Sequence, residues 1–288
     1  VPLLVKQGFQ GRVHTTAGTR DLCNILLPDS GHLQEEDAFF ANRHGYSKHQ
    51  TALPLYTKLD AINSMGRFHV ENWEKWFEPI KGWRARFFTA GHILGASSVL
   101  LEVAGRKILF SGDLGRPDDS LMNPPEDPPE ADTVLIESTY GDRLVGSEMC
   151  IRDRLKSQHQ IPVSLPVFLD SPMAIHTTAL FEKHMGEHRL SVVEVKNMDD
   201  AATMVQTPEQ SKALIKRHGP MVILAASGMA TGGRVLHHLA NYLGDHRNMV
   251  ILTGFQSPGT RGANLAAGAT TLRMHGKDIP VKAEIVQL

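Results

Sequence analysis

The 288 residues, 41% of them hydrophobic and 21% charged, have an ordinary globular composition and suffice for two domains, which excludes a disordered or fibrous chain. The formal net charge of −1 excludes a broad basic surface, so nucleic-acid binding would depend on local loops, helix N-termini and a few Arg or Lys residues. Two distant cysteines, Cys23 and Cys150, indicate no disulfide framework and favour a reducing cytoplasm. No apolar run reaches transmembrane length, so we expect no membrane partner.

The first elements are predicted to be helices. Thr19 is the expected cap of a helix over residues 19–30, because its hydroxyl can accept a hydrogen bond from a free backbone amide. The polar stretch at residues 32–49 is expected to lie at the surface. A second helix begins after Thr57, and Asp60, three residues later, completes a weak capping box.

A strand over residues 83–89 and a hairpin then follow. Two apolar runs, at 98–103 and 107–110, are joined by Ala104 and Gly105, a plausible hairpin turn. The hairpin would bring His92, before it, close to Asp113, after it. Imidazole and carboxylate ligands suit zinc or a similar divalent ion, so we interpret both residues as metal ligands. Alternatively, His92 is a hydrogen-bonded loop residue and Asp113 belongs to an ordinary turn.

A Pro-rich, acidic connector at residues 116–132 is expected to be an extended surface loop. The apolar run at 133–136 predicts a buried strand, with Glu137 at its carboxyl end. A carboxylate there could orient a metal ligand or transfer a proton, which makes Glu137 a candidate catalytic residue together with Asp113. It could equally cap a turn.

The stretch at residues 146–154, GSEMCIRDR, does not match the pattern of its surroundings. It resembles the translation of a common sequencing adapter, so we interpret it as a sequencing artefact at a deletion junction. An ordinary polar loop is the alternative. An independently sequenced copy of the gene that retains these residues would contradict the artefact interpretation.

From residue 166 onward the pattern of strand, loop and helix occurs three times. Apolar strands are predicted at 167–169, 221–225 and 249–253, and Ser171 is a suitable cap for the first helix. This alternation predicts a parallel α/β sheet whose functional loops follow the carboxyl ends of the strands. Two more strands are expected near the end of the chain, within residues 271–288.

Two of these loops are rich in glycine and each carries an arginine, which favours an anionic ligand. Small residues let backbone amides approach a phosphate, and arginine can bind it through two hydrogen bonds. The histidines at 237 and 238, on the following helix, are expected to pack or to be solvated. The predicted phosphate-binding residues are Ser227, Gly228, Met229, Gly232, Gly233, Arg234, Ser257, Thr260 and Arg261.

The motifs AGHILGAS, LFSGDLGR, IESTYGDR, FLDSPMA, SGMATGGR, GFQSPGTRG and MHGKDIPVKAEI occur in this order along nearly the whole chain. Together they resemble the RNA-processing β-CASP branch of the metallo-β-lactamase superfamily. The resemblance implies a partial metallo-β-lactamase αββα sandwich over residues 1–145 and a partial β-CASP domain, with a parallel α/β sheet, over 155–288. It also implies a cytoplasmic ribonuclease, an endonuclease or a 5′ exonuclease, with RNA as its partner and a homodimer as a possible assembly.

By the same resemblance, the complete protein would hold two zinc ions, with Asp113 bridging them and His92 binding one. Glu137 would orient a histidine that protonates the leaving oxygen. The family's HxHxDH block would precede this chain and two further histidines would follow it, so we expect the chain as given to be an incomplete fragment, inactive and weak in zinc binding. The alternatives are a non-catalytic RNA-binding β-CASP partner subunit and a small-molecule metallo-hydrolase.

Overall fold

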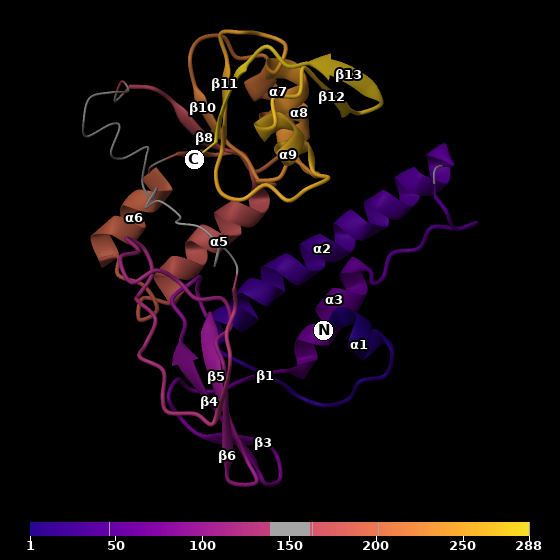
Figure 1. Ribbon diagram of the computed structural model, residues 1–288. Helices are drawn as coiled ribbons and strands as arrows, with labels where there is room; N and C mark the ends of the chain where they lie inside the picture. The colour runs from indigo at the N-terminus through magenta and orange to yellow at the C-terminus, as the bar shows by residue number, and fades with distance from the viewer. Residues whose placement is uncertain (46, 139–161, 163, 201, 288) are drawn as a thin grey trace. The chain divides into compact units, whose positions relative to one another are not determined.

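The computed structural model describes residues 1–45, 47–138, 162, 164–200 and 202–287 (Figure 1). The chain forms two compact units. The first comprises the described residues of Val1–Met149 and His176–Lys196, and the second those of Cys150–Ile175 and Asn197–Leu288. Residues 176–196 thus pack with the N-terminal part of the chain. The adapter-like stretch at 146–154 lies outside the described residues.

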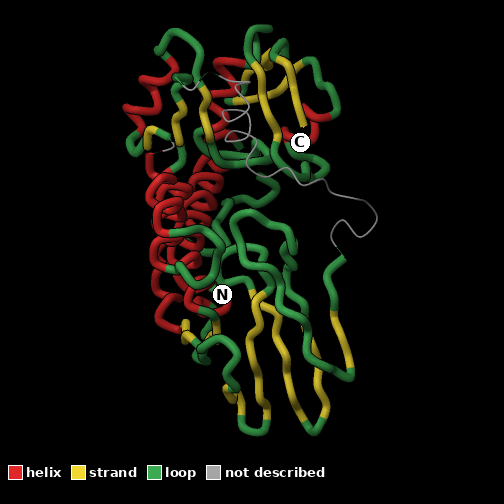
Figure 2. The backbone as a smooth tube through the Cα atoms, turned by 90° about the vertical axis from the view of Figure 1, so that its left-hand side faces the viewer, coloured by secondary structure: helices red, strands yellow, loops and turns green. Residues whose placement is uncertain are grey.

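The first unit contains a five-stranded sheet with the strand order β3-β4-β5-β6-β7, whose long strands are yellow in Figure 2. The pairs β3-β4, β4-β5 and β5-β6 are antiparallel, whereas β7 runs parallel to β6. The long connector between β6 and β7 permits this, because a tight turn can join only antiparallel strands. The strands are β3 (Phe77–Ile80), β4 (Trp83–Thr89), β5 (Ser97–Val103), β6 (Arg106–Phe110) and β7 (Thr133–Leu135).

The predicted hairpin is confirmed. Strands β5 and β6 pair from Val103 and Arg106 onward, around Ala104 and Gly105. These two turn residues have φ values of 49° and 72°, the left-handed pair that a two-residue hairpin turn requires. At the opposite end of the sheet, the end of β4, the start of β5 and the end of β6 lie together, and the loops there carry the two predicted metal ligands.

Helix α2 is longer than the helix predicted at residues 19–30. Helix α2 is capped by Thr16, not by Thr19, whose amide donates to the Thr16 hydroxyl at 3.3 Å. The helix continues through Pro28 to His44. Its middle packs tightly on the next helix, since a Cβ at Gly31 would lie 2.7 Å from backbone atoms of residues 57 and 58. This tertiary contact outweighs the local tendency of proline to end a helix.

The remaining N-terminal elements agree with the sequence pattern. The predicted capping box of α3 is confirmed: Thr57 accepts from the Asp60 amide at 3.1 Å and the Asp60 carboxylate accepts from the Thr57 amide at 2.9 Å. The histidines at 32, 44 and 49 are exposed, as expected. The elements are α1 (Pro2–Lys6), α2 (Ala17–His44), α3 (Lys58–Ser64), the 3-10 turn η1 (Met65–Arg67) and the parallel strands β1 (Val13–Thr15) and β2 (Phe68–Val70).

The second half of the chain alternates strands and helices, which confirms the α/β class. One parallel sheet has the order β10-β8-β9, and β11 pairs in parallel with β14. The strands are β8 (Val167–Leu169), β9 (Thr203–Met204), β10 (Val222–Leu224), β11 (Met249–Leu252), β12 (Thr271–Met274), β13 (Lys277–Pro280) and β14 (Glu284–Gln287). The helices are α5 (Pro172–Lys183), α6 (Val192–Asp200), α7 (Pro208–Ile215), α8 (Val235–Tyr242) and α9 (Arg261–Ala266).

Two predicted strands differ from the structure. The C-terminal residues form three strands instead of two, because the amides of Lys282 and Ala283 both donate to Leu243 O, at 2.7 and 3.0 Å, and separate β13 from β14. Strand β7 is not buried: Val134 and Leu135 are 54% and 49% exposed. This strand lies at the edge of the described sheet and has only one neighbouring strand there. The apolar sequence therefore correctly indicated a strand but not its burial.

In the described part of the chain, no helix combines the length and the apolar character needed to cross a bilayer.

Candidate functional site

His92 and Asp113 lie on the same cavity of the first unit. His92 is in the loop between β4 and β5, and Asp113 follows β6. Both residues line a cavity of about 220 Å³, together with Thr19, Leu22 and Cys23 of α2. Both residues are exposed. The structure therefore brings together the two predicted ligands, and both are accessible.

Backbone contacts hold the two loops against each other. The Gly115 amide, two residues after Asp113, donates to Ala90 O at 2.7 Å. A Cβ at Gly115 would lie 1.8 Å from Gly91 O and 2.7 Å from His92 N, so only glycine permits this approach. The separation of the His92 and Asp113 loops is thus fixed by the main chain.

Glu137 lies beside the Asp113 turn. Its Oε1 accepts a hydrogen bond from the Leu114 amide at 2.6 Å, and its own amide donates to Ser111 Oγ at 2.9 Å. Both partners flank Asp113 within the turn that follows β6. Glu137 therefore stabilises the backbone next to a predicted ligand, in agreement with the alternative that it caps a turn.

The donors suit a zinc ion in their chemistry, although they are few. Nitrogen from His92 and oxygen from Asp113 are usual zinc ligands. Across residues 1–45, 47–138 and the described C-terminal ranges, however, no group of three or more His, Cys, Asp or Glu side chains is placed to hold a metal ion. Two ligands make only part of a tetrahedral site.

The two predicted phosphate-binding loops of the second unit contact each other. The Gly262 amide donates to Met229 O at 2.9 Å. The Arg261 guanidinium donates to Ala230 O and Thr231 O at 3.3 and 3.2 Å. A Cβ at residues 228 or 232 would meet nothing within 4 Å, so the backbone there is open to a ligand. The two loops therefore lie side by side in this unit.

Their polar side chains mainly stabilise the loops themselves. Ser227 Oγ lies 2.9 Å from Thr231 Oγ1. Thr260 caps α9 by accepting from the Ala263 amide at 3.2 Å, and its hydroxyl donates to Ser257 O at 2.7 Å. Gly233 has φ 75°, the left-handed conformation that leads the chain into α8.

Arg234 binds inside the protein. Its guanidinium donates to Asp170 Oδ1 at 2.6 Å and to the carbonyl oxygens of Val205 and Gln206 at 2.9 and 3.0 Å. To bind a phosphate through two hydrogen bonds, as the sequence predicts, Arg234 would have to leave these partners. Its role in the described structure is to hold the start of α8 to β8 and β9.

Asp170 is the central acceptor of this network, and sequence reasoning missed it. The side chain is fully buried, and it also binds Ser211 Oγ at 2.5 Å and His238 Nε2 at 2.6 Å. Burial alone would raise the pKa of Asp170, but hydrogen bonds from Ser211, Arg234 and His238 outweigh it and lower the pKa. The packing role predicted for His238 is confirmed, since it is only 6% exposed. The available signal was an aspartate at the end of a buried strand.

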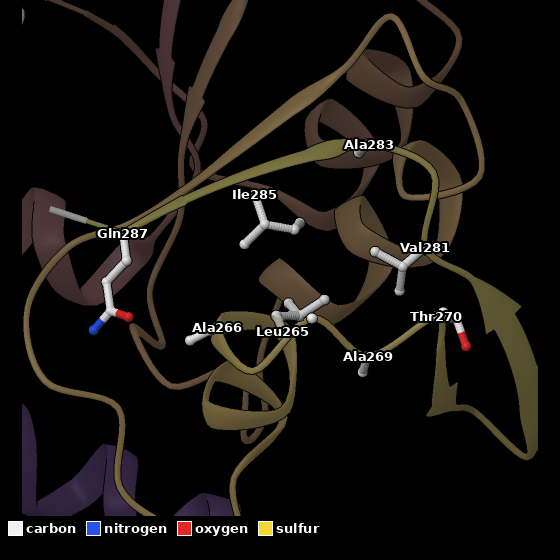
Figure 3. A pocket seen from close by; sticks show the side chains of 9 residues that line it. Leu265, Ala266, Ala269, Thr270, Val281, Ala283, Ile285 and Gln287 are labelled. Carbon is white, nitrogen blue, oxygen red and sulfur yellow. The ribbon is translucent and has the colours of Figure 1, made fainter.

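A second cavity, of about 280 Å³, lies beside α9 and β14 in the second unit (Figure 3). Leu265, Val281, Ile285 and Gln287 are among the residues that line it. Its lining contains no ionisable side chain, so it offers no acid, base or metal ligand.

Comparison with known proteins shows which proteins the chain resembles in sequence. Residues 149–265 match the model of the Beta-Casp domain. The chain is 30% identical to ribonuclease TTHA0252 of Thermus thermophilus, over 99% of this chain and 70% of that protein. It is 28% identical to the RNase J-like protein of Methanocaldococcus jannaschii, over 81% and 63% of the two chains. It is 25% identical to cleavage and polyadenylation specificity factor subunit 3 of Dictyostelium discoideum, over 99% and 40%. The chain thus spans 40% to 70% of the length of these relatives.

Proposed function

Because the chain belongs to the β-CASP family of the metallo-β-lactamase superfamily, we propose that the protein is a zinc-dependent ribonuclease that hydrolyses RNA phosphodiester bonds. One observation carries the proposal within the chain itself. His92 and Asp113, whose side chains are typical zinc ligands, line one cavity, and their loops contact each other through the backbone at Gly115.

The chain's own residues would bind and orient the ions. His92 would offer an imidazole nitrogen and Asp113 a carboxylate to hold zinc. Glu137 holds the Asp113 turn through the Leu114 amide and, by the family resemblance, would also orient a histidine that protonates the leaving oxygen. Zinc, when bound, supplies Lewis-acid activation of water and stabilises charge on the phosphoryl oxygens.

RNA phosphates would contact the loops at Ser227 and Ser257 in the second unit. The open backbone at residues 228 and 232 supports this, because amide groups there can approach an anion closely. Arg234 and Arg261 would act mainly by holding these loops, since their guanidinium groups already bind carbonyl and carboxylate oxygens. We also propose a cytoplasmic location, which suits a chain whose Cys23 is a free thiol.

The test is cleavage of RNA labelled at either the 5′ or the 3′ end by the complete gene product, with and without a zinc chelator. We expect chelation, His92→Ala and Asp113→Ala each to abolish cleavage, while His49→Ala, at an exposed histidine outside the cavity, leaves it unchanged. The two labels distinguish endonuclease from 5′ exonuclease products. RNA binding without cleavage by the complete wild-type product would instead identify a non-catalytic partner subunit.

We further propose that the 288-residue chain alone is inactive and binds zinc weakly, because the two ligands that the described residues bring together do not close a tetrahedral site. Metal analysis after extensive dialysis measures this. Two tightly held zinc ions in this polypeptide would contradict it.

A further inference from the structure

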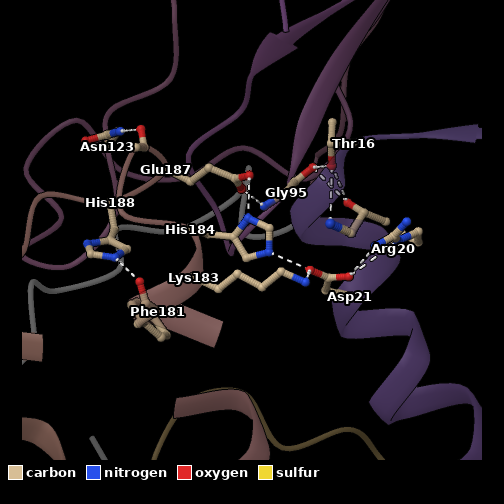
Figure 4. A network of polar contacts seen from close by, with 12 residues as sticks. Thr16, Arg20, Asp21, Gly95, Asn123, Phe181, Lys183, His184, Glu187 and His188 are labelled. Atoms are coloured by element: carbon tan, nitrogen blue, oxygen red, sulfur yellow. Dashed lines mark hydrogen bonds and ion pairs between the residues drawn. The ribbon is translucent and has the colours of Figure 1, made fainter. Parts of the chain in front are cut away.

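Residues 184–189, directly after α5, contact the His92 loop within the first unit (Figure 4). The Glu187 carboxylate accepts a hydrogen bond from the Gly95 amide, with 2.5 Å between Oε2 and N. Gly95 lies three residues after His92. A side chain from the C-terminal half of the sequence is therefore bonded to the loop that carries a predicted zinc ligand.

Gly95 is held closely on its other side by the start of α2. Its carbonyl accepts hydrogen bonds from the hydroxyls of Thr16 and Thr19, both at 2.8 Å. It has φ 79°, and a Cβ there would lie 2.0 Å from Thr19 N. Gly18 packs against the same bond, since a Cβ at Gly18 would lie 2.5 Å from Glu187 Oε2. A Cβ at either glycine would collide with its neighbours, so both positions must be glycine for the Glu187 carboxylate to reach the Gly95 amide.

Glu187 is itself held by a chain of polar contacts, visible in Figure 4. Its Oε1 lies 3.3 Å from His184 Nδ1, and His184 Nε2 lies 2.8 Å from Asp21 Oδ2. The side chains of all three residues are no more than 12% exposed. Burial raises the pKa of Asp21, but hydrogen bonds from Lys183, His184 and Arg20 outweigh it and lower the pKa to about 2. An ionised Asp21 therefore anchors His184 over the whole physiological range.

The same segment also contacts the connector that follows Asp113. Asn123 Nδ2 donates to Gly186 O at 2.9 Å. The Arg189 amide donates to Leu121 O at 2.8 Å. Residues 184–189 thus contact both the loop that carries His92 and the connector that follows Asp113.

We propose that Glu187, supported by His184, is a positioning residue of the zinc site. It fixes the His92 loop by accepting the Gly95 N–H, and so sets the place of the His92 imidazole before any metal binds. A carboxylate in a mostly buried site forms a stronger hydrogen bond than a neutral acceptor does, which makes this contact effective. The inference rests on the proposed zinc-dependent function.

The experiment compares three substitutions in the complete gene product. Glu187→Gln keeps an acceptor of the right length without the charge, Glu187→Asp keeps the charge but is one methylene too short, and Glu187→Ala removes both. Glu182→Ala, at an exposed glutamate near the end of α5, is the control. Three quantities are measured: Gly95 amide hydrogen exchange in the metal-free protein, zinc affinity by competition with a chromophoric chelator, and thermal stability.

We expect Glu187→Ala to speed Gly95 exchange by about 10- to 100-fold and to weaken zinc binding by about 10- to 100-fold. Glu187→Asp should show a similar loss, and Glu187→Gln, which keeps an acceptor of the right length but not the charge, should restore part of both quantities. Wild-type exchange and zinc affinity in the Ala and Asp variants would overturn the proposal, and so would a Gln variant as impaired as Ala. Exchange is measured without zinc or RNA, so a failure of the proposed ribonuclease activity would be separately visible. If the Ala variant does not fold, the Asp and Gln pair still decides the outcome.

Discussion

Substituting Gly115 by alanine should separate the two loops of the zinc site. The added Cβ would lie 1.8 Å from Gly91 O, whereas carbon and oxygen atoms normally come no closer than about 3.3 Å. The loops must therefore move apart by roughly 1.5 Å, which breaks the 2.7 Å hydrogen bond from the Gly115 amide to Ala90 O. Overpacking and the lost bond together should cost about 2–4 kcal/mol.

This displacement also separates His92 from Asp113. Misplacement of reacting groups by about 1 Å can cost roughly 100-fold in rate, so we expect a loss of at least that size in RNA cleavage, together with weaker zinc binding. Urea unfolding, zinc competition and cleavage assays measure the three effects. Gly66→Ala is the matched control, because a Cβ at Gly66 would meet nothing within 4 Å. If Gly115→Ala matched this control in stability and in zinc affinity, the backbone contact would not fix the site.

Three further predictions concern stability. The pKa of Asp21 is lowered to about 2 in the folded protein and is about 4 in the unfolded chain, so ionised Asp21 should stabilise the fold by about 2 kcal/mol above pH 4. This stabilisation should be lost as the pH falls toward 2. Acid unfolding of Asp21→Asn should lack this loss, whereas Asp37→Asn, at an exposed position of the same helix, should retain it. Asp170→Ala should cost about 3–5 kcal/mol in urea unfolding, because it leaves Arg234 without its buried partner. Thr57→Ala should cost about 1 kcal/mol, whereas Thr57→Ser, which keeps the capping hydroxyl, should cost much less.

The features that the sequence predicted well are those that local chemistry determines. Ala104 and Gly105 define the hairpin because two successive left-handed residues suit its turn. Thr57 and Asp60 cap each other through groups three residues apart. The hairpin placed His92 and Asp113 at one end of the sheet, where the structure has them. Local patterns were sufficient for these features.

Contacts between distant residues account for what was missed. Helix α2 passes Pro28 because its middle packs on α3, a contact that no window around Pro28 contains. Glu187 and Gly95 are 92 positions apart, and nothing near Glu187 in the sequence indicates a buried carboxylate. Arg234 was predicted to bind phosphate because it is an arginine in a glycine-rich loop. Only the folded chain shows that its guanidinium already binds Asp170.

The exposed position of β7 has a consequence for work with this polypeptide in solution. Val134 and Leu135 of β7, at the edge of the described sheet, are 54% and 49% exposed, and Ile136, directly after the strand, is 69% exposed. An apolar edge strand is a template for pairing with another chain, and such pairing increases with protein concentration. A dimer of the 288-residue chain is therefore evidence of a specific assembly only if it persists in the variant Val134→Lys, because a charge there opposes strand-to-strand aggregation.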